Sequence, residues 1–198
     1  MKDHFQERAK EWDKGSIRVN GAKTIAEAIS KKIELDSTMS IMDFGVGTGL
    51  LGFEIAKVVD SVVGVDTSAN MLEKLKEKNT QEVFIKPHHG DIVKNPIDDS
   101  FDGIISSMTL HHVENLKHFF QTIHKNLNED GFIAIADLEL EDGTFHSDNE
   151  GVFHFGFDEK ELFAIVSESG FKDIQIENIN TINKPHRDFG IFLLTAKR

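Results

Sequence analysis

The stretch that most constrains this chain is Ile41–Leu51, where a short apolar run breaks into glycines at every second position and an apolar helical pattern follows. This order predicts a buried strand, a tight turn and the start of a helix. Glycine suits such a turn because it adopts unusual φ angles and lets a ligand approach the backbone without a Cβ. The helix then begins with unpaired N–H groups and a partial positive charge.

A second signal follows Gly45 by 21 residues. Ser61–Val65 is a short apolar run typical of a buried strand, and Asp66 comes directly after it. In a βαβ unit, an acidic side chain at the tip of the second strand accepts both hydroxyls of a ribose. The two signals together predict a ligand with an adenosine-like half.

Composition narrows the partners. The 198 residues suffice for one domain with a substantial core, and 22 basic against 34 acidic residues give a net charge of −12. This balance argues against nucleic acid, because phosphate recognition relies on lysine and arginine. There is no cysteine, no apolar signal segment and no run long enough to span a membrane. We expect a cytoplasmic protein, monomer or homodimer, that acts on a small molecule and not on nucleic acid or a membrane.

Two units are expected along the chain. Residues 1–39 read as an amphipathic helical arm, with Ile25, Ile29 and Ile33 at helical spacing. Its large apolar residues Phe5 and Trp12 pack on the domain or belong to a lid over the ligand. Residues 40–198 form the ligand-binding domain.

Within that domain, strands alternate with helices. Besides the strands at 41–44 and 61–65, strands are predicted at 83–86 (stopped by Pro87), 101–106, 132–138, 173–178 and 190–197, and helices at 69–77, 115–127 and 158–169. A long loop, 139–157, precedes the last helix, and no helical pattern separates the last two strands. We therefore predict an α/β, Rossmann-like, doubly wound and mostly parallel seven-stranded sheet with an antiparallel C-terminal strand.

The adenosine-bearing ligand has two interpretations. Gly47–Gly52 satisfies the G-x-G-x-x-G spacing of a nicotinamide dinucleotide site, which favours an NAD(P)-dependent oxidoreductase. However, the chain has no tyrosine for the Tyr/Lys pair of short-chain dehydrogenases, and no second mononucleotide-binding half is visible. A non-catalytic module that binds adenosyl ligands is a further alternative.

The second interpretation accounts for more of the chain. Its motifs are Asp43-x-Gly45-x-Gly47-x-Gly49, Asp66, Gly90-Asp91-Ile92, and Ser106-Ser107 before Leu110-His111-His112-Val113. Over nearly its whole length the chain resembles the class I S-adenosylmethionine-dependent methyltransferases, and most of all the small-molecule enzymes of the ubiquinone/menaquinone-biosynthesis type. The resemblance implies S-adenosyl-L-methionine as cofactor and methyl transfer to a small acceptor by in-line displacement from the sulfonium.

The resemblance also assigns cofactor contacts. It places the methionine moiety on the turn Gly45, Val46, Gly47 and Gly49, its ammonium near Asp43, the ribose diol on Asp66 and the adenine at Asp91 and Ile92, with Ser106, Ser107 and Met108 opposite the turn and Thr67, Ser68 and Met71 as secondary contacts.

The acceptor side is less defined. His111 and Asp137 stand at predicted strand ends and are the candidates for a general base, which an oxygen or nitrogen acceptor needs. In the long loop, His146, Phe153 and His154 are candidates to line an acceptor pocket. Two histidines at this spacing are weak evidence for a metal, and we expect none. The absence of cysteine excludes cytosine-C5 methylation, but the atom that is methylated and the acceptor stay open.

Overall fold

The protein is seen here in a computed structural model, which describes residues 12, 13 and 15–198. Its elements are, in chain order, α1 Ser16–Lys32, β1 Ser40–Phe44, α2 Leu50–Ile55, β2 Ser61–Asp66, α3 Ala69–Lys78, β3 Ile85–His89, β4 Phe101–Ser107, the 3₁₀ helix η2 Leu110–His112, α4 Leu116–Lys125, β5 Leu127–Leu138, α5 Glu159–Glu168, β6 Lys172–Lys184 and β7 Arg187–Lys197.

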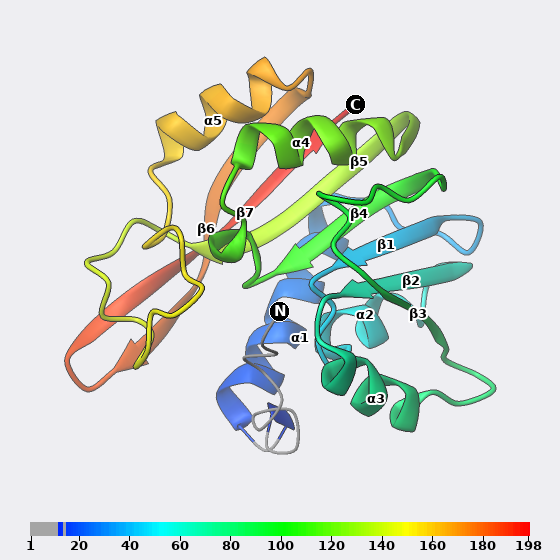
Figure 1. The fold of residues 1–198 in the computed structure, drawn as a ribbon, viewed down its shortest axis with the longest axis horizontal. Helices are drawn as coiled ribbons and strands as arrows, with labels where there is room; N and C mark the ends of the chain where they lie inside the picture. Colours follow the sequence, from blue (N-terminus) through cyan, green and yellow to red (C-terminus); the bar gives the residue numbers. More distant parts are fainter. Residues whose placement is uncertain (1–11, 14) are drawn as a thin grey trace.

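The strands form a seven-stranded sheet in the order β3-β2-β1-β4-β5-β7-β6 (Figure 1). Strands β1 to β5 are parallel to one another, while β7 is inserted antiparallel between β5 and β6. The order reverses at β1, from which the chain winds first to one side and later to the other. The predicted doubly wound, mostly parallel sheet with an antiparallel C-terminal strand is confirmed.

Two apolar cores lie on the two faces of this sheet. Successive residues of β1 alternate between them, so that Met42 packs with Phe119 of α4 and Ile41 packs with Ile29 of α1 and Leu51 of α2. Helices α4 and α5 cover one face and α1, α2 and α3 the other (Figure 1). Strands covered on both faces need continuous apolar sequence, which the central strands have.

The third strand differs from its prediction. It begins at Ile85 and continues through Pro87, which lies opposite Gly64, to His89. The expectation that Pro87 stops the strand was wrong because β3 is the sheet edge. An edge strand has one side without ladder partners, so a residue with no N–H is tolerated there.

The C-terminal hairpin is longer than predicted. Strands β6 and β7 pair over their whole lengths, and only Pro185 and His186 separate them. The sequence pattern underestimated β6 because its residues beyond Asn178 are mostly polar, as suits the other edge of the sheet. Helix α4 in turn ends at Lys125, and β5 already begins at Leu127.

The amino-terminal arm is described from Trp12 onward, except for residue 14. Helix α1 buries Ile25, Ala26 and Ile29 against the sheet, and the guanidinium of Arg18 lies 4.3 Å from the centre of the Trp12 ring. Phe5 lies outside the described residues. The division at residue 39 and the role of the arm as a lid stay predictions. No described helix combines the length and the apolar character needed to cross a membrane.

The loop 139–157 is closed at its base by backbone hydrogen bonds. The N–H of Phe157 donates to Leu138 O at 3.0 Å, and that of Glu141 donates to Phe155 O at 2.9 Å. Gly156 sits inside this closure with φ +69°, and a Cβ there would overlap the carbonyl of Glu139. This base determines where the rest of the loop can reach.

We expect Gly156→Ala to destabilise the chain more than Gly151→Ala. Both glycines have positive φ, so alanine carries a conformational cost of about 1–2 kcal/mol at either position. Only Gly156 also meets backbone atoms, which adds about 1–3 kcal/mol of overpacking, since no atom lies within 4 Å of a Cβ at Gly151. Urea unfolding of both variants measures the difference, and equal losses would contradict the close fit at the loop base.

Candidate functional site at the carboxyl edge of the sheet

The parallel strands bring most of the predicted site residues to one edge of the sheet. The turn after β1 is held against the end of β2, because the N–H groups of Gly45 and Val46 both donate to Val65 O, at 2.9 and 3.0 Å. Ligands of open α/β sheets lie across this edge, beside the strand where the order reverses. The edge is therefore the candidate site.

Asp66 links the turn to the next helix. Its Oδ2 accepts from the N–H of Gly47 at 2.8 Å, and its Oδ1 accepts from the N–H of Ser68 at 2.8 Å. Ser68 in turn caps α3 by accepting from the N–H of Met71, which is buried. The carboxylate thus stands at the tip of β2, as predicted, with both oxygens directed by backbone donors.

Asp43 lies beneath the same turn. Only 2% of it is exposed, and its Oδ2 has no hydrogen-bond partner among the described residues. Burial, and secondarily the charge of Asp66, raise the pKa of Asp43 well above its ordinary value, which the backbone N–H of Gly52 only partly offsets. A buried carboxyl oxygen without a partner is costly for the fold, and a cationic ligand group beside it would favour the ionised form of Asp43.

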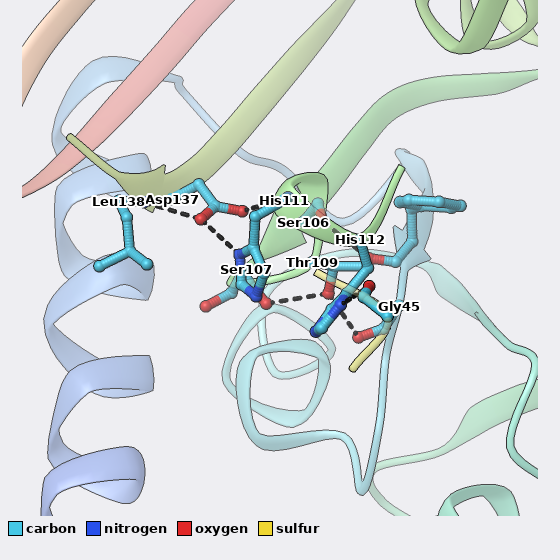
Figure 2. A network of polar contacts seen from close by, with 10 residues as sticks. Gly45, Ser106, Ser107, Thr109, His111, His112, Asp137 and Leu138 are labelled. Atoms are coloured by element: carbon cyan, nitrogen blue, oxygen red, sulfur yellow. Dashed lines mark hydrogen bonds and ion pairs between the residues drawn. The ribbon is translucent and has the colours of Figure 1, made fainter. Parts of the chain in front are cut away.

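The residues at the end of β4 and just after it pack against the glycine turn. Ser106 is buried and donates its hydroxyl to Phe44 O at 2.7 Å, while the Thr109 hydroxyl lies 3.1 Å from Ser107 O and 3.3 Å from Gly45 O (Figure 2). Thr109 packs so closely on Gly45 that a Cβ at Gly45 would overlap its side chain. The sequence motif contained Thr109 but gave it no role.

The predicted adenine side lies beyond β2. Ile92 is buried, and Asp91 accepts from the N–H of Val93 and forms an ion pair with Lys94 at 2.8 Å. Burial opposes ionisation, but these bonds leave the pKa of Asp91 lower than its ordinary value. Thr67 is exposed next to Asp66.

The amino-terminal arm reaches this site, which the sequence did not predict in detail. One oxygen of Asp13 accepts from the Thr48 hydroxyl at 2.5 Å, and the other pairs with Lys78 at the end of α3 at 2.7 Å. Thr48 is buried within the glycine turn. Asp13 therefore joins the arm to the turn, although nothing in its sequence context distinguishes it from the other acidic residues.

His111 and Asp137, both predicted as catalytic candidates, form a buried pair. The ring Nδ1 of His111 is 2.7 Å from Asp137 Oδ1, and the backbone N–H of His111 donates to Oδ2 at 3.2 Å (Figure 2). The N–H of Leu138 also donates to Oδ1, at 2.7 Å. Because a carboxylate only accepts, the neutral form of His111 that fits this contact has its proton on Nδ1 and a lone pair on Nε2. This arrangement is that of an oriented general base.

The long loop lies against this pair. The ring centres of His146 and His111 are 4.9 Å apart, and His154 Nε2 is 2.9 Å from Val113 O. The Phe153 N–H donates to His111 O at 3.0 Å, but its side chain is 53% exposed. The structure thus brings His146 to the dyad, places His154 beside η2 and leaves the Phe153 ring at the surface. Among the described residues, no group of three or more ligating side chains is placed to hold a metal.

Comparisons with known proteins show which family and fold this chain resembles. A family profile described as a methyltransferase domain matches residues 42–135. An uncharacterised methyltransferase of Schizosaccharomyces pombe is 28% identical over 169 residues, covering 75% of this chain and 57% of the relative. Demethylmenaquinone methyltransferase of Staphylococcus aureus is 29% identical over 139 residues, covering 67% and 58%. The matched part of the chain thus spans less than two thirds of the length of each of these relatives.

A solved structure has the same fold. Phosphoethanolamine N-methyltransferase 2 of Haemonchus contortus, in complex with S-adenosyl-L-methionine, aligns with a TM-score of 0.69 at 18% identity. The alignment covers 87% of this chain and 52% of that one.

We expect Asp43→Asn to remove a pH-dependent loss of stability. Between the ordinary carboxyl pKa and the raised pKa of Asp43, the folded chain keeps a proton that the unfolded chain releases, so the free energy of unfolding falls as pH rises. In the variant, which has no carboxyl group at this position, this fall in the free energy of unfolding is absent. Its stability relative to the parent should therefore grow by up to about 1.4 kcal/mol per pH unit above about pH 4. Urea unfolding at several pH values tests this, with the exposed Asp60→Asn as control. A difference that does not change with pH would contradict a protonated Asp43.

Proposed function

We propose that this chain, which belongs to the class I S-adenosylmethionine-dependent methyltransferases, binds S-adenosyl-L-methionine at the carboxyl edge of its sheet and transfers the methyl group to a small-molecule acceptor. The fold, the profile match and the similarity to enzymes named as methyltransferases support this reading.

The observation that carries the proposal is that Asp43 is buried beneath the glycine turn and that its Oδ2 has no hydrogen-bond partner among the described residues. A cofactor with an ammonium and a sulfonium would bring positive charge close to Asp43, and this charge would favour the ionised form of the carboxyl group. The pyrophosphate of a nicotinamide dinucleotide would instead bring negative charge to a turn that already has Asp43 and Asp66 close together. Electrostatics therefore favour methyl transfer over the oxidoreductase alternative.

The residues at the edge fit the parts of the cofactor. Gly45, Gly47 and Asp43 would receive the methionine moiety, Asp66 the ribose, and Asp91 with Ile92 the adenine. Space above Gly47 is open, since no atom lies within 4 Å of a Cβ built there. When bound, the cofactor supplies an electrophilic methyl group on a positively charged sulfur. The protein mainly aligns the partners and excludes water, and alignment alone can supply about 7–11 kcal/mol.

His111 and Asp137 would serve the acceptor. Asp137 fixes the tautomer and orientation of the ring, and His111 Nε2 takes the proton of the acceptor as the new bond forms. An oriented base near the carboxyl edge of the sheet favours an enzyme over a module that only binds adenosyl ligands.

The setting of the reaction is part of the proposal. The net charge of −12 and a relative named for demethylmenaquinone support a small acceptor and not a nucleic acid. We propose that the protein works in the cytoplasm as a monomer or homodimer. The Asp13 contacts with Thr48 and Lys78 support a lid function of the amino-terminal arm.

Calorimetry should detect binding of S-adenosyl-L-methionine and none of NAD(H). We expect Asp66→Ala to weaken this binding by about 10- to 100-fold, because hydrogen bonds to a charged group contribute about 1.5–3 kcal/mol. Asp60→Ala is the matched control, since Asp60 precedes the opposite end of the same strand. Unchanged affinity in Asp66→Ala, with the fold retained, would overturn the assignment of Asp66, and tighter binding of NAD(H) would overturn the proposed activity.

Removal of the base should slow turnover. With an acceptor found by screening metabolites for release of S-adenosylhomocysteine, we expect His111→Gln and Asp137→Asn each to lower kcat by about 10²- to 10⁴-fold. Affinity for the cofactor should stay as in the parent. His118→Gln, an exposed histidine on α4, is the control. Full activity in both dyad variants would exclude the dyad from the chemistry.

A further inference from the structure

Two buried ring nitrogens near the carboxyl edge of the sheet have no hydrogen-bond partner among the described residues. They are the Nε2 atoms of His111 and His146. The centres of the two rings are 4.9 Å apart, and the ring planes are inclined to each other by 44°. Buried polar atoms are nearly always hydrogen-bonded, because one left without a partner loses its bonds to water and gains none in return. Two such atoms on neighbouring rings therefore point to a polar ligand group.

The two nitrogens have different roles. Asp137 accepts from His111 Nδ1, so in the neutral ring His111 Nε2 can only accept. His146 is neutral at neutral pH, because burial and then the nearby His111, His112 and Lys184 lower its pKa to about 4, with only Asp137 acting in the opposite direction. A neutral imidazole carries one N–H, so His146 can donate where His111 accepts.

The loop holds His146 in this position. His112 Nδ1 is 2.7 Å from Gly151 O on the far side of the loop. On the near side, Lys184 lies at the tip of the β6–β7 hairpin. Its Nζ donates to the carbonyl of Phe145 and lies 4.0 Å from the centre of the Phe145 ring. His146 thus sits between two anchored points, and its proximity to His111 is built into the fold.

We propose that His111 and His146 together hold one hydroxyl group of the acceptor, which makes the chain an O-methyltransferase and His146 a second catalytic residue. This inference rests on the proposed methyl transfer. The hydroxyl donates to His111 Nε2 and accepts from the Nε2–H of His146. In the reaction the O–H bond breaks and its proton goes to His111. An oxygen lone pair forms the O–CH₃ bond, and the electrons of the broken C–S bond stay on sulfur.

Oxygen is favoured by its count of lone pairs. A hydroxyl oxygen has two, so one accepts from His146 while the other attacks the methyl group. An amine nitrogen has one and cannot do both, a carbon acid has none, and sulfur is a weak acceptor. The hydrogen bond from the His146 N–H to the acceptor oxygen would also become stronger as negative charge develops on that oxygen. A bond that strengthens in this way stabilises the transition state.

The tautomers test this arrangement without any cofactor or acceptor. Two-bond ¹H–¹⁵N spectra of the uniformly ¹⁵N-labelled chain near pH 7 should show His111 protonated on Nδ1 and His146 protonated on Nε2. Protonation of His146 on Nδ1 alone, or on both nitrogens, would overturn the proposal, because the required donor or its neutral form would be missing. Cofactor calorimetry decides the underlying methyl transfer separately, so the two failures are distinguishable.

Two variants add a kinetic readout. His146→Phe keeps a ring but loses the donor, and we expect it to lower kcat by about 10²- to 10³-fold, as loss of one such donor does elsewhere. His146→Gln retains an N–H and should recover part of the rate. Equal activity of the parent and both variants would overturn the role of His146. Mass spectrometry of the product should place the methyl group on oxygen, and methylation on nitrogen, carbon or sulfur would overturn the inference.

Discussion

The turn after β1 is the constraint on which the rest of the site depends. It must reverse the chain between a buried strand and a buried helix, keep Gly45 clear for Thr109, and direct the N–H of Gly47 at Asp66. These contacts join β1, β2 and β4 at one point. Because each neighbour touches backbone atoms of the turn, its geometry is fixed by the packing of the sheet and not by the turn residues alone.

The site has two chemically different halves. Around β1 and β2, the carboxyl groups of Asp43 and Asp66 lie close together at the glycine turn, and the fold tolerates a buried Asp43 Oδ2 with no partner among the described residues, at a cost in stability. Around the ends of β4 and β5, the polar groups include the hydroxyls of Ser106 and Thr109 and the imidazoles of His111 and His146, and Asp137 orients the ring of His111. A positively charged methyl donor suits the first half and a proton-bearing acceptor the second. Such local costs are typical of functional sites.

Sequence reasoning reached the two halves unequally. The glycine turn and Asp66 were predictable because both belong to one βαβ unit, in which spacing along the chain determines position in space. His111 was predicted to follow the fourth strand and Asp137 to end the fifth, but their pairing was not predicted, since it depends on β4 and β5 being neighbours. Thr109 and Asp13 had no sequence signal, because their importance comes from what they touch.

The sequence by itself determined the alternation of strands and helices, the reversed strand near the carboxyl end and the acidic residues at successive strand tips, since these depend on local periodicity and short spacings. Only the tertiary structure decided that Pro87 lies inside an edge strand and that the β6–β7 hairpin extends to Lys184. It also decided that the 139–157 loop carries His146 to His111. The physical reason is the same in each case: edge position, strand pairing and loop closure are set by contacts between residues far apart in the chain, which no local pattern records.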